Sequence, residues 1–264
     1  MREICRDLAD EYESLDDMVA PLTEEQWEWI TPFIGWSIKT EIAHIAFFDG
    51  TARIAATDPE AFSNHLEEVY QDEEAFRVKH EKIRARPPTQ ILGYWRQERK
   101  TLVEALRPLS PKARLPWYGP TMSARSFATA RIMETWAHGQ DIVDTLRIER
   151  EPTHRLRHIA HLGVTTFGWS YANRGLEVPD VPFRVELTAP SGELWAWGSE
   201  EAGESVRGTA EDFCLVVVQR RHVEDTELEV EGDVVREWML IAQAFAGPPA
   251  KGPTPGERIG KKGI

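Results

Sequence analysis

The chain has 264 residues and a formal net charge of −13, which argues against nucleic acid or an anionic membrane as its main partner. Its two cysteines, Cys5 and Cys214, form no CxxC motif and no disulfide framework, so a reducing cytoplasm is the expected setting. The N-terminal segment lacks the apolar core of a signal peptide, and no apolar run approaches membrane-spanning length. We therefore predict a soluble cytoplasmic protein that binds neither nucleic acid nor membrane.

Most of the sequence up to Gly175 has the pattern of long amphipathic helices. Apolar residues recur with helical spacing in five segments, residues 2–20, 37–56, 91–106, 131–146 and 153–173, and Ser123 can cap the fourth helix. Thr23 and Gln26 have the spacing of a capping box before a short helix. The charge-rich residues 60–86 are interpreted as short surface helices, with a mobile lid as the alternative. These features predict a mainly α N-terminal domain over residues 1–177.

After Gly175 the pattern changes to that of a small α+β domain, predicted over residues 178–246. Strands are expected at residues 181–187, 193–197, 204–208 and 227–230, and helices at 209–221 and 234–245. Pro190–Gly192 suits a hairpin turn between the first two strands. Residues 247–264 are rich in Gly, Pro and Lys and are predicted to form a flexible tail.

A pair of metal-ligating residue types lies within RIMETWAHGQDIVDTL, residues 131–146. Glu134 and His138 stand four residues apart, and so share one face of a helix, where they could bind one metal ion. His44 is the best third candidate, because an unpaired imidazole beside an apolar helix face is costly unless it is bonded or metallated. Two histidines and one carboxylate leave open positions on Zn²⁺, as in catalytic sites. For each residue alone, a hydrogen-bonded structural role is the alternative.

Two segments carry a resemblance to a known family. WSIKTEIAH (Trp36–His44) and RIMETWAHGQDI (Arg131–Ile142) together resemble the mycothiol-dependent maleylpyruvate isomerase family, which belongs to the wider DinB-like metal-binding proteins. The resemblance covers roughly the first two-thirds of the chain and implies a DinB-like up-and-down four-helix bundle. It also implies that a divalent metal, usually zinc, is bound by His44, Glu134 and His138. A low-molecular-weight thiol such as mycothiol is the implied co-substrate, alongside a small-molecule substrate.

The C-terminal part is similar to the second domain of the same family, which is related to sterol carrier folds. The similarity lies in GTAEDFCLVVVQRR (Gly208–Arg221) and ELEVEGD. In the isomerase an arginine of this domain takes part in activity, so Arg220 is the candidate catalytic residue. Related domains carry a Gly-Arg pair here, whereas this chain has Gln219 in place of the glycine. A helix end that complements the helix dipole is the alternative for Arg220.

The predicted metal site is compatible with several reactions. Zinc lowers the pKa of a bound thiol, and the thiolate is the nucleophile. Addition of the thiolate to an activated double bond, rotation and loss of the thiol give a cis–trans isomerisation, whereas an adduct that is kept makes the protein an S-transferase. Water in the open position would give a hydrolase. A metal- or small-molecule-binding module without turnover is the alternative from another functional class.

Further residues are assigned supporting roles. Asp141, three residues beyond His138, is expected to orient a ligand histidine through its second ring nitrogen, and Asp49 is the weaker candidate for that role. The cations expected to attract an anionic substrate are Arg53, Arg125 and Arg131. The histidines interpreted as surface residues are His65, His80 and His222. The sequence leaves the oligomeric state open, a homodimer included.

Overall fold

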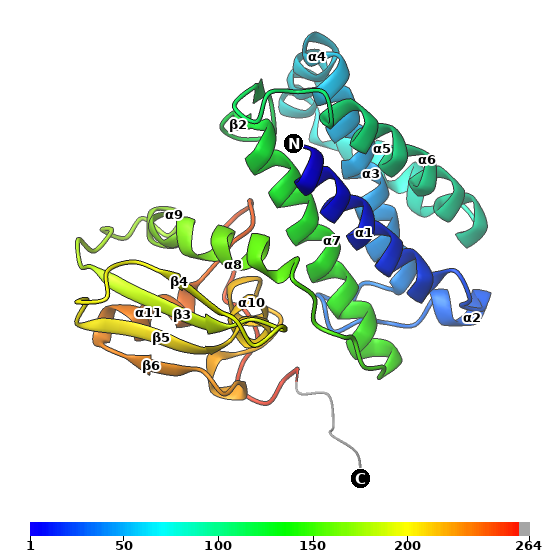
Figure 1. Ribbon diagram of the computed structural model, residues 1–264. Helices are drawn as coiled ribbons and strands as arrows, with labels where there is room; N and C mark the ends of the chain where they lie inside the picture. The colour runs from blue at the N-terminus through cyan, green and yellow to red at the C-terminus, as the bar shows by residue number, and fades with distance from the viewer. Residues whose placement is uncertain (259–264) are drawn as a thin grey trace. The chain divides into compact units, whose positions relative to one another are not determined.

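The computed structural model describes residues 1–258 and divides the chain into two compact units, Met1–Thr145 and a second that begins at Leu146. The first unit is helical, apart from a short antiparallel pair of strands that precedes its last helix (Figure 1). Its elements are α1 (Arg2–Val19), α2 (Glu24–Trp27), α3 (Ile38–Thr57), α4 (Pro59–Gln71), α5 (Glu73–Arg84), α6 (Pro88–Leu106), β1 (Arg114–Leu115), β2 (Met122–Ser123) and α7 (Ala124–Leu146).

Local sequence signals determine where these helices begin. The capping box of Thr23 and Gln26 is confirmed, with both reciprocal hydrogen bonds present. Ser37 caps α3 by accepting a hydrogen bond from the Thr40 backbone N–H at 3.3 Å. Ser123 accepts from the Ser126 N–H at 3.0 Å at the start of α7. Both helices that carry the predicted metal ligands therefore have starts fixed by the sequence.

The core of the first unit forms where α3 packs along α6, and α1 packs against α6 as well. Gly50 allows the close approach of α3 to α6, because a Cβ atom there would lie 2.7 Å from the Tyr94 hydroxyl oxygen. The glycine that weakens an isolated helix thus leaves room for the Tyr94 side chain of α6. Together the helices bury apolar side chains from α1, α3, α6 and α7.

Residues 60–86 form the two short helices that were expected, α4 and α5, but this segment is more than a surface excursion. Phe62 is completely buried, and His65 and His80 are half-buried. Both histidines belong to an aromatic cluster, so their assignment to the surface was wrong. The cluster consists of Phe47, Phe48, Phe62, His65, Phe76, His80, Trp117 and Tyr118.

The second unit combines helices with a four-stranded sheet. Its elements are α8 (Leu156–Thr165), α9 (Phe167–Ala172), β3 (Phe183–Thr188), β4 (Leu194–Trp197), β5 (Glu204–Thr209), α10 (Ala210–Val217), the short 3₁₀ helix η1 (Val223–Asp225), β6 (Glu229–Glu231) and α11 (Asp233–Ile241). The strand order is β4-β3-β5-β6, with β3 parallel to β5 and both outer pairs antiparallel. The predicted hairpin and the two later strands are confirmed.

The division between Thr145 and Leu146 differs from the boundary expected after residue 177. The segment expected as one helix over residues 153–173 is split into α8 and α9 at Thr166. These helices belong to the second unit because α8 packs on α10 and α9 on α11. Gly163 brings α8 close to α10, since a Cβ atom there would lie 2.8 Å from Val217 Cγ2. Apolar spacing predicts such a helix but not the partner that buries it.

The segment expected as a flexible tail is bonded to the second unit over residues 247–258. Ala250 N–H donates to Gln243 Oε1 at 3.1 Å, and Gly256 N–H donates to Asp225 Oδ1 at 2.9 Å. The Arg258 guanidinium donates to the Gln219 carbonyl at 3.2 Å and is buried. The remainder of that prediction, residues 259–264, lies outside the described residues.

Within residues 1–258, every helix is too short or too polar to cross a membrane.

Candidate metal site

The structure brings the three predicted ligands together. His44 lies on α3, while Glu134 and His138 lie one turn apart on α7. One ligand atom of each residue lies within 4.8 Å of the others. His138 Nε2 is 3.4 Å from Glu134 Oε2, and the rings of His44 and His138 have centroids 4.7 Å apart. Two separate helices thus bring two imidazoles and one carboxylate close to one another.

Aromatic rings surround the two histidines. Trp36 lies nearly parallel to the His138 ring at 6.1 Å and 5.0 Å from the His44 ring, while Phe33 meets His138 edge-on at 5.4 Å. The turn that presents Phe33 and Trp36 contains Ile34 at φ 42° and Gly35 at φ 76°. A β-branched residue seldom adopts a positive φ, and strain of this kind clusters at functional sites. The loop between α2 and α3 is thus shaped to place rings beside the histidines.

Glu41 contacts the far side of the His138 ring. Its Oε2 lies 2.7 Å from His138 Nδ1, and its Oε1 accepts a hydrogen bond from the Thr31 hydroxyl at 2.6 Å. Asp141 is the residue that was expected to orient a ligand histidine. Its Oδ2 atom lies farther away, 3.9 Å from His138 Nδ1. Both carboxylates are fully buried. Glu41 was not predicted from the sequence, although a carboxylate flanked by the apolar residues of α3 was the available signal.

A second buried polar group lies at Asp49, five residues after His44 on α3. Asp49 accepts hydrogen bonds from Tyr12 at 2.6 Å, Trp95 at 2.9 Å and Arg131 at 2.8 Å. Burial alone would lower the pKa of Arg131, but the Asp49 carboxylate opposes this and leaves the pKa raised. Burial raises the pKa of Tyr12 well above its usual value, and the Asp49 charge adds to the effect. These contacts account for the polar atoms of Asp49, which therefore stabilises the first unit.

The three arginines expected to attract an anionic substrate differ in burial and in ion pairing. Arg131 is buried in its ion pair with Asp49, and Arg53 pairs with Glu98 at 2.6 Å. Arg125 is exposed. The charges of Arg53 and Arg131 are thus largely balanced by carboxylates from the same unit.

Residues 8–143, more than half of the chain, match the family model described as the mycothiol maleylpyruvate isomerase N-terminal domain. The chain belongs to this family. The relationship predicted from Trp36–His44 and Arg131–Ile142 is thereby confirmed. Residues 179–229 match a second model, described as wyosine base formation.

Relatives of this family member include uncharacterized proteins of two Mycobacterium tuberculosis strains. Each is 42% identical over 247 residues, covering 93% of this chain and 96% of the relative. A crystal structure of the mycothiol-dependent maleylpyruvate isomerase is 17% identical, with a TM-score of 0.54. A histidine-to-alanine mutant of that enzyme gives 16% and 0.55, and each comparison covers 81% of this chain and 87% of the other. These structures show a shared fold, mostly helical with a small sheet-containing C-terminal part.

The second unit of this family member contains Arg220, in the turn after α10. Its side chain is buried and donates a hydrogen bond to the Val218 carbonyl at 2.9 Å. Gln219 has φ 59°, in the left-handed region that glycine adopts freely. The Gln219 amide donates to the Ala242 carbonyl at 2.9 Å, a contact that glycine cannot make. The catalytic role of Arg220 and the sterol-carrier relationship stay predictions.

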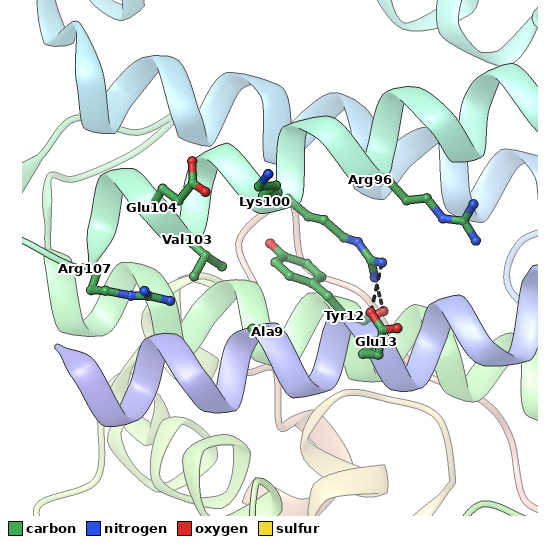
Figure 2. Close-up of a pocket in the computed structure, with 9 residues that line it drawn as sticks. Ala9, Tyr12, Glu13, Arg96, Lys100, Val103, Glu104 and Arg107 are labelled. Atoms are coloured by element: carbon green, nitrogen blue, oxygen red, sulfur yellow. Dashed lines mark hydrogen bonds and ion pairs between the residues drawn. The ribbon is translucent and has the colours of Figure 1, made fainter.

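A groove of about 420 Å³ lies between α1 and α6 of this family member (Figure 2). Its lining residues do not include the three candidate metal ligands. Figure 2 shows Arg96, Lys100 and Arg107 along one wall and Glu13 on the other. Arg96 and Arg99 both bind the buried carboxylate of Asp16, at 2.5 and 2.6 Å. These ion pairs hold α6 to α1, so the two arginines at the groove have a structural role.

Proposed function

We propose that this protein is a metal-dependent, thiol-using enzyme, an isomerase or S-transferase that acts on a small electrophile. The observation that carries the proposal is the convergence of His44, Glu134 and His138 within 4.8 Å. Ligand atoms bound to a tetrahedral zinc ion at about 2.0–2.1 Å stand roughly 3.3 Å apart. The separation of His138 Nε2 from Glu134 Oε2 is 3.4 Å. The donor set therefore fits zinc without rearrangement of that pair.

Each residue around the donor set has a defined part in the proposal. Glu41 accepts the Nδ1–H of His138, which leaves the Nε2 lone pair directed toward Glu134 and His44. Trp36 and Phe33 cover the two imidazoles and limit the access of water. Two imidazoles and one carboxylate leave coordination positions open. Zinc held by these residues would lower the pKa of a thiol bound at an open position, so that the thiol would be present as a thiolate at neutral pH.

The burial of the chain's own thiols supports the use of an external thiol. Cys5 and Cys214 are completely buried. Burial raises the pKa of the Cys5 thiol and raises that of Cys214 well above its usual value. Neither is therefore a ready nucleophile, since reactivity requires an accessible thiolate. Mycothiol, the thiol named for the related enzyme, is the first one to test.

A second candidate function is a metal-binding module without turnover. It is favoured by the apolar character of the rings beside the histidines, contributed by Phe33, Trp36 and Phe48. Such walls can retain a metal and a small ligand without promoting a reaction. Turnover separates the two candidates, because both require the same metal site.

Zinc analysis of the purified protein tests the metal site directly. We expect one equivalent of zinc per chain, lost in His138→Ala while the far-ultraviolet circular dichroism spectrum is retained. His154→Ala provides the control, because His154 is exposed and lies in the second unit. Full zinc occupancy in His138→Ala would overturn the ligand assignment.

Activity is then measured on the zinc-loaded protein with mycothiol and maleylpyruvate, the thiol and substrate in the name of the related enzyme. Mycothiol-dependent turnover of maleylpyruvate or of another activated double bond supports the enzyme. Stoichiometric zinc without turnover over a panel of such electrophiles supports the binding module instead.

A further inference from the structure

His80 is a polar residue of the aromatic cluster and lies beside the candidate metal site. It lies on α5, and its ring meets the His44 ring edge-on, with centroids 5.7 Å apart and an interplanar angle of 89°. It also meets the Phe47 ring edge-on, with centroids 5.2 Å apart. Its Nε2 atom is buried and has no hydrogen-bond partner among residues 1–258. Leaving such an atom unsatisfied costs free energy, so its retention calls for a reason.

His65 shows that this is not a general property of the aromatic cluster. It lies in the same cluster, is half-buried like His80, and its Nε2 is 2.7 Å from the Tyr118 hydroxyl. The Nε2 atom of His65 thus has a partner within the protein, whereas the buried Nε2 atom of His80 has none among the described side chains. The ring of His80 also contacts the ring of His44, which belongs to the proposed metal site.

We infer that His80 binds the small molecule held at the open face of the metal, through a hydrogen bond to Nε2. The inference rests on the proposed function, because it requires a ligand beside His44. The ligand is a small compound that combines an oxygen or nitrogen, bonded to His80, with an apolar or unsaturated part packed against Phe47 and Phe48. His80 is thereby a specificity-determining residue supplied by α5 rather than by the helices that carry the proposed metal ligands.

The test uses the full-length protein loaded with cobalt(II), whose visible spectrum reports on ligands, and acetohydroxamate as the probe. His80→Phe keeps the aromatic packing and removes the hydrogen bond, so we expect the dissociation constant of acetohydroxamate to rise about tenfold. His80→Gln places an amide nitrogen near the Nε2 position and should restore binding to within about threefold. His65→Phe is the matched control and should leave the probe's affinity unchanged.

Two further measurements distinguish ligand binding from a structural role. His80→Phe should leave the affinity for cobalt(II) unchanged, and it should keep or raise the melting temperature of the metal-free protein, because it removes an unsatisfied buried atom. Equal probe affinity in the unsubstituted protein and in His80→Phe would overturn the inference. A loss of cobalt affinity in His80→Phe would also overturn it, because His80 would then act on the metal site itself. Failure of the unsubstituted protein to bind cobalt would instead reject the proposed function, and the inference with it.

Discussion

Glu41 Oε2 lies 2.7 Å from His138 Nδ1, and both side chains are buried. A carboxylate at this position accepts the Nδ1–H, so it fixes the tautomer in which Nε2 carries the lone pair. Thr31 holds the other oxygen of Glu41 at 2.6 Å and so prevents the carboxylate from rotating away. The orientation of one candidate ligand on α7 is therefore set by residues from α3 and the loop that precedes it.

Glu41→Gln is expected to weaken zinc binding by about 10- to 100-fold, the usual effect of removing a carboxylate that orients a ligand histidine. The amide no longer supplies a charged acceptor and can present its NH₂ group to Nδ1. Competition against a chromophoric chelator measures the affinity.

Asp141→Asn is the comparison for this prediction, because Asp141 Oδ2 is 3.9 Å from the same nitrogen. Its effect should be smaller than that of Glu41→Gln. The reverse order would assign the orienting role to Asp141, as expected from the sequence.

Much of the architecture was predictable because local signals and packing agree. Apolar spacing located α1, α3, α6 and α7, and the caps at Ser37 and Ser123 fixed where two of them start. The same spacing could not tell that α8 and α9 belong with the second unit, because periodicity reports a buried face and not the element that covers it. The bonded segment after residue 247 was missed for a related reason, since its contacts come from Asp225, Gln219 and Gln243.

The candidate site was predictable only where its residues share a helix or a motif. Glu134 and His138 stand at i and i+4, and His44 was found through its apolar neighbours. Glu41 was missed because its partner His138 is 97 residues away in the sequence. His80 was missed because it lies in a charge-rich segment whose composition is typical of a solvated surface. Tertiary contacts, which composition does not report, decide both cases.

Asp49→Asn should destabilise the fold by about 3–5 kcal/mol, because it leaves the buried Arg131 charge without its carboxylate. The present ion pair joins Arg131 Nε to Asp49 Oδ1 at 2.8 Å, with both side chains almost fully buried. Urea unfolding followed by circular dichroism measures the change.

Tyr12→Phe serves as the milder comparison. It removes one hydrogen bond to the same carboxylate and should cost about 1.5–3 kcal/mol, since the acceptor is charged. A loss in Asp49→Asn no larger than that in Tyr12→Phe would contradict the importance assigned to the Arg131 charge.

The two native thiols should resist modification. Cys5 and Cys214 are completely buried and have raised pKa values, so at pH 8 a disulfide reagent such as Ellman's should release no chromophore from the folded protein within the time of mixing. Addition of guanidinium chloride should expose both thiols. Rapid reaction of the folded protein would show that one of them is accessible and would weaken the case for an external thiol.

Glu211 gives the second unit a specific pH dependence. Burial raises the pKa of this carboxyl, and the charge of Asp212 beside it adds to the effect. The folded state therefore binds the proton more tightly than the unfolded state, so this group stabilises the fold below its unfolded pKa, and that stabilisation is lost as pH rises through the folded pKa. Glu211→Gln removes the ionisation. The melting temperature of Glu211→Gln minus that of the unsubstituted protein should increase between pH 4 and pH 7. Glu193→Gln is the control at an exposed position, and an equal increase there would show that the dependence comes from net charge rather than from burial of Glu211.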